Sequence, residues 1–140
     1  MAPLPSRRTG SAGSAGSAAA LAALLLAAGT THLMVPRFYE PLIPSGLGSP
    51  SAWVIGSGVA ELVCGLAVAV PATRRAGALA AAALFVAVFP GNVVMALRSR
   101  PGARRLAEHR LVAWGRLPLQ VPLVRWALAV AGSAGRVTAS

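Results

Sequence analysis

The chain has few charged residues, and it contains no lysine and no aspartate. Only 11% of its residues are charged, whereas soluble domains carry about a quarter. With 56% hydrophobic residues, this composition excludes an ordinary soluble domain and indicates a chain that lies in a membrane. The formal charge of +10 comes from arginines that cluster between apolar runs, which is typical of membrane loops and predicts no nucleic-acid partner.

Residue types that carry much enzyme chemistry are also rare or missing. Cys64 is the one cysteine, so neither an internal disulfide nor a Cys-x-x-Cys redox pair can form. Without aspartate, a Ser/His/Asp triad is impossible, and there is no glycine-rich dinucleotide motif. The two histidines, His32 in a span and His109 in a loop, do not form a plausible haem ligand pair. A stand-alone enzyme is therefore disfavoured, and no metal site is expected.

Four long apolar runs dominate what is present. They cover residues 18–35, 51–70, 76–97 and 111–134, and each is long enough to cross the hydrocarbon core of a bilayer. The sequence therefore predicts an all-α fold, an integral membrane four-helix bundle that forms one domain over residues 18–135. The lipid bilayer is its first expected partner.

The segments outside these runs have distinct compositions. Residues 10–17 repeat Gly, Ser and Ala, which predicts that residues 1–17 form a flexible N-terminal tail. Arg7 and Arg8 ahead of an apolar run leave a second interpretation open, a secretory signal cleaved at Ala27-Ala28-Gly29. Residues 36–50 are rich in proline and glycine and predict an irregular connection, not a helix.

The third span carries Pro90, Gly91 and Asn92 side by side. Pro90 removes a backbone donor and leaves the carbonyl of Val86 without its helical partner. Gly91 would let another element approach the backbone closely, and the Asn92 amide needs a hydrogen-bonding partner in hydrocarbon. Because lipid cannot satisfy these groups, this part of the helix should face protein or a wet cavity. A kink that only packs on a neighbour is the alternative.

Glu61 lies in the middle of the second span, on a face where another helix can approach closely. We therefore expect it to point into the bundle, where a carboxylate must be protonated, paired or hydrated. Arg116 and His32 are the expected partners. Arg125 is an alternative partner unless its guanidinium extends to the membrane surface. The small residues three or four positions from the glutamate are Ser57, Gly58, Cys64 and Gly65.

Each span places one polar side chain in the same half of the membrane. We name the face with the N-terminus side A and the face with residues 36–50 side B. At about 1.5 Å per residue, His32 lies about one turn from side B, Asn92 about 9 Å, Gln120 about 6–12 Å and Glu61 about 15 Å. These residues predict a ligand-binding or proton-handling pocket with Arg116 at its rim. A hydrogen-bonded polar core that only fixes helix packing is the alternative.

Three motifs, in order along the chain, resemble those of the DoxX-like integral membrane proteins. The resemblance covers roughly residues 20–132 and implies a multi-pass protein of the bacterial cytoplasmic membrane. The chain departs at Gly91, where the family often has alanine, at Val93-Val94, where a histidine is frequent, and at Arg125. The motifs are Val59-Ala60-Glu61-Leu62 with Gly65, the stretch Val88 to Ala96, and Arg116-Leu117-Pro118-Leu119-Gln120 followed by Trp126.

The resemblance also implies a class of function. Some DoxX-like proteins are subunits or partners of membrane redox systems that involve quinones, sulfur compounds or superoxide defence, whereas many have no established activity. The first hypothesis is a component of a redox complex, in which Glu61 and Gln120 hydrogen-bond a quinone-like ligand. Its partner would be a redox protein or a second copy of the chain. The alternatives are a non-catalytic binder or carrier of a small apolar or lipid-like molecule, and an anchor that recruits a soluble protein through the Arg98–Arg110 loop.

The arginine distribution predicts the orientation in the membrane. With four spans, both termini lie on side A, which holds five arginines, whereas side B holds seven. Positive residues in short loops prefer the cytoplasm, so we expect side B inside and both termini outside. If Arg116 lies within the membrane and is not counted, side B holds six arginines and side A holds five. The side A arginines are Arg7, Arg8, Arg74, Arg75 and Arg136, and those of side B are Arg37, Arg98, Arg100, Arg104, Arg105, Arg110 and Arg116.

Fusions to Ser140 test this orientation. A fluorescent protein that matures only in the cytoplasm should stay dark there, and an alkaline phosphatase that needs the extracytoplasmic space should be active. A bright fluorescent fusion together with an inactive phosphatase fusion would reverse the assignment.

Overall fold

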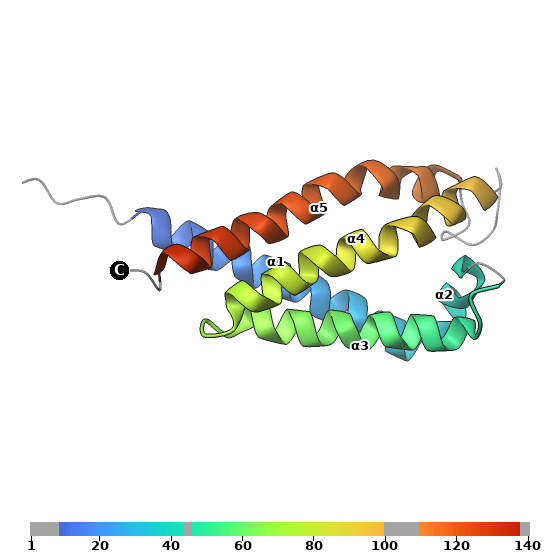
Figure 1. Ribbon diagram of the computed structural model, residues 1–140, viewed down its shortest axis with the longest axis horizontal. Helices are drawn as coiled ribbons and strands as arrows, with labels where there is room; N and C mark the ends of the chain where they lie inside the picture. Colours follow the sequence, from blue (N-terminus) through green and yellow to red (C-terminus); the bar gives the residue numbers. More distant parts are fainter. Residues whose placement is uncertain (1–8, 44–45, 100–109, 138–140) are drawn as a thin grey trace, which may run out of the picture.

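The computed structural model describes residues 9–43, 46–99 and 110–137, which form helices and short connections (Figure 1). Four helices are long: α1 (Thr9–Met34), α3 (Pro50–Ala69), α4 (Arg74–Arg98) and α5 (Arg110–Val137). Each contains a segment long and apolar enough to cross a membrane. The predicted all-α four-helix bundle is confirmed, and its composition is that of a multi-pass membrane protein.

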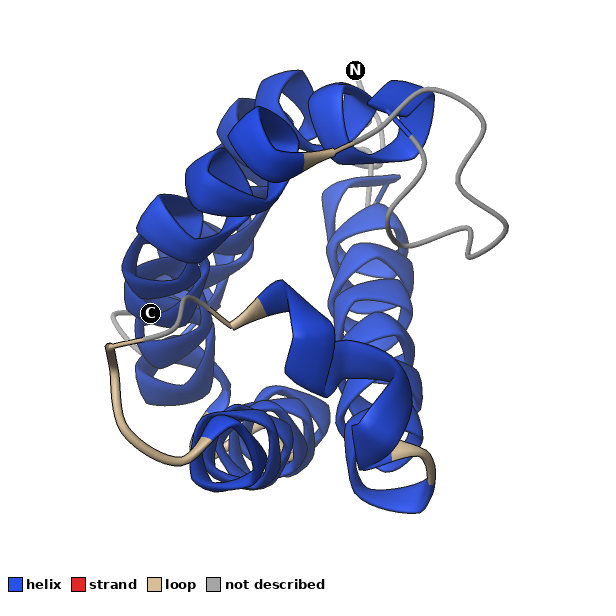
Figure 2. Cartoon of the chain, turned by 90° about the vertical axis from the view of Figure 1, so that its right-hand side faces the viewer, coloured by secondary structure: helices blue, strands red, loops and turns tan. Residues whose placement is uncertain are grey.

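The bundle consists of two helix pairs. α1 packs along α3, α4 packs along α5, and a tight turn joins α3 to α4. Figure 1 shows α4 and α5 running together along one side of the molecule, with α3 along the other. In the end-on view of Figure 2, the short helices lie between these pairs at the side B end. Near side A the Trp126 indole nitrogen of α5 donates to the Ser17 hydroxyl of α1 at 2.8 Å.

Two apolar clusters fill the bundle at different depths. The larger cluster lies in the half nearest side A and includes Leu21, Leu25, Val68 and Val130, each 2% exposed or less. The smaller cluster lies near side B, where Met95 and Ala96 of α4 pack with residues of α5 and the 3₁₀ turn. The polar side chains of the spans come between these clusters along the helices, so the structure has a polar layer at that depth.

Glycines set the distance between α1 and α3. A Cβ atom on Gly29 would lie 2.6 Å from the backbone oxygen of Gly58, and one on Gly58 would lie 2.9 Å from the His32 Cβ. No side chain fits at that separation, so the two backbones approach as closely as they do because both positions lack one. This contact brings His32 directly over the face of α3 that carries Glu61.

The first span begins earlier than the composition indicates. α1 starts at Thr9, so residues 9–17 are helical and do not belong to a flexible tail; residues 1–8 lie outside the described residues. The reason is packing: Ser17 bonds to Trp126 and Ala18 is fully buried, and an existing helix extends at little cost. Leu21 and Leu25 are also core residues, so this helix packs with the rest of the bundle.

The connection from α1 to α3 is partly helical, in contrast to the predicted irregular segment. It contains a single turn, α2 (Pro36–Tyr39), followed by the 3₁₀ turn η1 (Glu40–Leu42). Pro36 occupies the first turn of α2, a position where its missing donor costs nothing and its fixed φ angle suits a helix. The Ser51 hydroxyl donates to the Glu40 carboxylate, which ties this connection to the start of α3.

Side chains in and after the turn from α3 to α4 donate hydrogen bonds to the last carbonyls of α3. The Arg74 guanidinium donates to the carbonyls of Val68 at 3.0 Å and Ala69 at 3.2 Å. The Thr73 hydroxyl donates to the carbonyl of Ala67 at 2.9 Å. The last carbonyls of a helix have no intrahelical donors, and a cation there also opposes the negative end of the helix dipole. Arg74 therefore has a structural role on side A.

Substitution of Gly29 tests the close contact between α1 and α3. Gly29→Ala should lower the free energy of unfolding by about 1–3 kcal/mol, because the added methyl group meets backbone that cannot move aside. Gly56→Ala is the matched control, since nothing lies within 4 Å of a Cβ there and alanine favours a helix. Unfolding of both variants in detergent should be followed by thermal scans. Equal midpoints for the two variants would contradict the proposed packing.

Candidate functional site

His32 and Glu61 form a polar contact between two of the long helices. The Nδ1 atom of His32 lies 2.7 Å from Oε2 of Glu61, and the side chains are 20% and 13% exposed. The contact joins α1 to α3 and is short enough for a charge-assisted hydrogen bond. Of the three expected partners of Glu61, the structure therefore selects His32.

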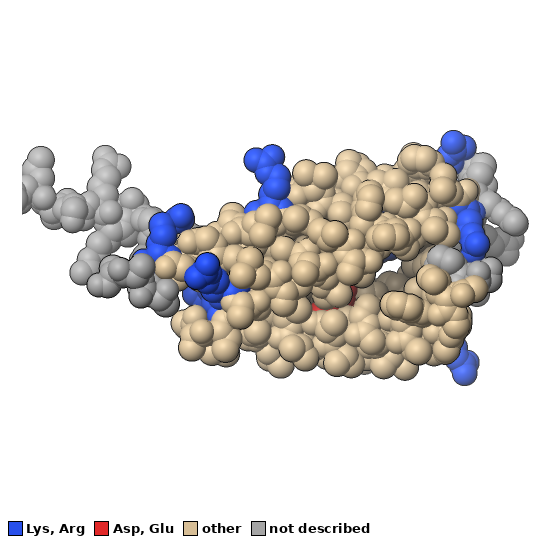
Figure 3. All heavy atoms as spheres, in the orientation of Figure 1, with Lys and Arg blue, Asp and Glu red and all other residues tan. Residues whose placement is uncertain are grey.

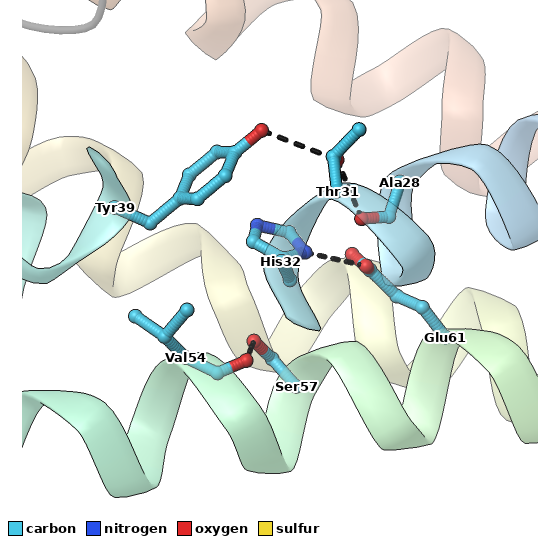
Figure 4. Close-up of polar contacts among 7 residues, drawn as sticks. All are labelled: Ala28, Thr31, His32, Tyr39, Val54, Ser57 and Glu61. Atoms are coloured by element: carbon cyan, nitrogen blue, oxygen red, sulfur yellow. Dashed lines mark hydrogen bonds and ion pairs between the residues drawn. The ribbon is translucent and has the colours of Figure 1, made fainter. Parts of the chain in front are cut away.

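Tyr39 holds the imidazole of His32 from the side B end (Figure 4). The two ring centroids are 4.2 Å apart with planes tilted by 59°. The Tyr39 hydroxyl donates to the Thr31 hydroxyl at 3.2 Å, and Thr31 donates to the carbonyl of Ala28 at 2.8 Å. α2 thus lies back over α1, and its tyrosine covers the His32–Glu61 pair on the side where a polar molecule would arrive from water.

Asn92 and Gln120 form a second polar group, between α4 and α5. The Asn92 amide nitrogen lies 3.4 Å from the Gln120 side-chain oxygen, and the Gln120 amide nitrogen donates to the backbone carbonyl of Phe85. Gln120 is 7% exposed. Phe85 precedes Pro90 by five residues and is next to Val86, whose carbonyl the proline leaves without its helical donor, so the Gln120 amide binds beside that carbonyl. Both ends of the Gln120 amide are therefore used within the protein.

Gly91 does not have the expected role. No heavy atom lies within 4 Å of a Cβ built at this position, so no other element approaches the backbone closely there. α4 also continues through Pro90 to Arg98. The contact from α5 is instead made by the Gln120 amide, which donates to the Phe85 carbonyl, one residue before the Val86 carbonyl that Pro90 leaves without its helical partner.

Neither Arg116 nor Arg125, the two arginines proposed as partners, pairs with Glu61. Within residues 9–43, 46–99 and 110–137, the one ion pair of Glu61 is that with His32. Arg116 is half-buried near the start of α5, and Arg125 is exposed on its outer surface. Arg116 therefore stays a candidate for the rim of the site, and Arg125 is not part of it. The anchoring loop proposed for residues 98–110 lies almost wholly outside the described residues.

The five predicted site residues thus form two groups on opposite helix pairs. His32 and Glu61 belong to α1 and α3, whereas Asn92, Gln120 and Arg116 belong to α4 and α5. Figure 3 shows a hollow on the face between α3 and α4, and a few acidic atoms are visible beside it. Among the described residues, no three His, Cys, Asp or Glu side chains gather where they could hold a metal ion. The arrangement can donate and accept hydrogen bonds and can hold a proton.

Two contributors to the site were not predicted from the sequence. They are Tyr39 and Thr31, which contact His32 or each other. Their spacing carried a usable signal, because Thr31 and His32 are consecutive and the short loop with Pro36 forces the chain to turn back. The carbonyl of Phe85 had no side-chain signal, and the carbonyl that Pro90 leaves without a donor is that of the next residue, Val86.

A family model matches most of the chain. Residues 21–131 match the family described as Domain of unknown function (DUF8561). The chain belongs to this family. The matched region contains both polar groups and ends just before the last turn of α5. No curated protein and no solved structure matches the chain significantly.

Substitution of Gln120 tests its role between α4 and α5. Gln120→Leu should lower the free energy of unfolding by about 1–3 kcal/mol, because it leaves the Phe85 carbonyl and the Asn92 amide without their partner. Asn92→Ala should cost less, about 0.6 kcal/mol, since it removes one long hydrogen bond between helices. Denaturation by SDS, read from tryptophan fluorescence, gives both values. A larger effect of Asn92→Ala than of Gln120→Leu would show that the carbonyl contact is unimportant.

Proposed function

We propose that this chain is a small membrane component of a redox system and binds a quinone-like ligand beside the His32–Glu61 pair. The observation that carries the proposal is the pair itself. Two titratable groups are held 2.7 Å apart inside helices of membrane-spanning length. Ionisable residues are costly at this depth and are functional candidates by default. Structural adhesion alone needs no titratable groups, because amides serve that purpose between α4 and α5.

The free atoms of the pair suit the two states of a quinone. Glu61 uses Oε2 and His32 uses Nδ1 for their mutual contact. The second carboxylate oxygen can accept a hydrogen bond from a quinol hydroxyl. The Nε2–H of the imidazolium, or of the neutral tautomer that leaves Nδ1 unprotonated, can donate to a quinone carbonyl. The pair can also hold the proton that such a carbonyl takes up on reduction.

This site differs from the one expected from the sequence in the residue that binds the ligand together with Glu61. Gln120 was expected to hydrogen-bond the ligand together with Glu61, but its amide already serves Phe85 and Asn92. We therefore assign ligand binding to His32 and Glu61, and we assign Gln120 to holding α4 and α5 together. Arg116 is kept as a rim residue that would attract an anionic or polar head.

The link to redox chemistry comes from the resemblance to DoxX-like proteins, some of which act with quinone-dependent membrane systems. The three motifs that carry the resemblance contain Glu61, Asn92 and Gln120, the residues that form the polar contacts between spans. This coincidence supports a common site. We accordingly propose the bacterial cytoplasmic membrane as the location, and a membrane redox protein as the partner that would exchange electrons with the ligand.

A groove near side B favours a second candidate, a non-catalytic carrier of an apolar or lipid-like molecule. The groove has a volume of about 540 Å³ and is lined by Met34, Val35, Pro36, Arg37 and Phe38. That volume lies within the usual range for small-molecule sites. Its lining is apolar except for the arginine, so it would take a hydrocarbon chain with an anionic end.

The ligand can be identified from the purified protein. We expect an organic extract of the full chain, isolated from membranes supplied with a short-tailed benzoquinone, to contain that quinone in proportion to protein. Glu61→Gln and His32→Gln should each reduce the bound quinone about tenfold or more, because each removes a charge-assisted hydrogen bond.

Glu40→Gln is the matched control, since the Glu40 carboxylate accepts from the Ser51 hydroxyl and is not part of the His32–Glu61 pair, and it should retain the quinone. Glu61→Ala should reach the membrane as well as the original chain, because loss of a buried charge eases insertion. A bound phospholipid with no quinone would favour the carrier. Unchanged quinone in Glu61→Gln would contradict the assigned site.

A further inference from the structure

Arg125 stands on the outer surface of the bundle. It is exposed, whereas Gln120, Ala127 and Val130 of the same helix are buried. At 3.6 residues per turn, the five residues between Gln120 and Arg125 place the arginine about 140° around α5 from the inward face. Figure 3 shows basic atoms rising from the α5 edge of the molecule, away from the basic groups at the two ends.

The depth of Arg125 makes this exposure costly. It follows Arg110 by 15 residues and precedes Arg136 by 11, which corresponds to about 22 Å and 16 Å along the helix. Side chains on a helix lean toward its N-terminus, and the N-terminus of α5 is on side B. The guanidinium therefore leans toward side B, the more distant surface. To reach the nearer surface, side A, the side chain would have to extend in the opposite direction. An arginine near the middle of a bilayer normally faces protein or water.

The surface around Arg125 has the form of a helix contact. Its neighbours along the same face, Val121, Ala129 and Gly132, are exposed and apolar or small. A Cβ on Gly132 would meet nothing within 4 Å, so packing within the chain does not require glycine there. A glycine inside a helix costs stability, whereas small residues on an outer face let a second helix approach.

We propose that this face of α5 binds a transmembrane helix of another membrane protein, which places a carboxylate at the depth of Arg125. Charge complementarity determines the partner. A second copy of the chain would bring two Arg125 side chains together, and the one acidic residue within its described spans, Glu61, is engaged by His32. A lipid phosphate lies at the membrane surface, about 15 Å from the bilayer centre. The proposal is independent of the ligand assigned to the hollow.

A designed helix provides the probe. The full chain, labelled with a donor dye, is placed in phosphatidylcholine vesicles with an acceptor-labelled Leu/Ala peptide of 24 residues carrying one central aspartate. Energy transfer measured against peptide density should show about tenfold tighter association than for the same peptide with leucine at that position. Arg125→Leu should reduce the association to the level of the leucine peptide, and Arg125→Lys should preserve most of it.

The control variant is Arg136→Leu, which removes a charge at the end of α5 and should leave the association with the aspartate peptide unchanged. Equal association of the aspartate and leucine peptides, or of the original chain and Arg125→Leu, would overturn the proposal. So would association between copies of the chain that is lost in Arg125→Leu, because a second copy would then be the occupant. Loss of peptide binding when anionic lipid is included in the same vesicles would point to a lipid headgroup as the occupant instead.

Discussion

A polar group in hydrocarbon has no solvent to bond with, and this constraint accounts for most of the specific contacts in the bundle. The His32 imidazole meets the Glu61 carboxylate, and the Gln120 amide meets the Phe85 carbonyl that lies one turn before Pro90. In each case the partner comes from another helix. The polar side chains therefore fix the rotation of each helix about its axis, which the uniformly apolar faces of alanine-rich helices would leave undetermined.

The number of spans was predictable from the sequence because length and hydropathy alone decide whether a segment can cross a bilayer. The start of α1 was not, since a Gly-Ser-Ala repeat has the same composition in a linker and in a helix that packs against Trp126. The turn of α2 was also missed, because prolines and glycines nearby indicate a loop, although Pro36 suits the first turn of a helix.

The residues of the polar layer were predictable, but their pairing was not. Counting residues gives the depth of a side chain and leaves its direction around the helix open. His32 and Arg116 were therefore both expected partners of Glu61, and Arg125 was an alternative. The glycine contact between α1 and α3 decided the pairing, because it brings His32 within 2.7 Å. The bond from Gln120 was hidden for another reason: its acceptor is a backbone atom.

The two polar groups have one property in common that bears on how the protein is made. Each joins two spans that are consecutive in the chain, α1 with α3 and α4 with α5. During synthesis, the segment with Glu61 therefore enters the membrane when its histidine is already there, and no carboxylate has to wait for a distant span. The first two spans can leave the translocon as a hydrogen-bonded hairpin, and the last two can follow as a second one. Assembly then reduces to the docking of two hairpins, and the apolar core near side A is the surface along which they meet.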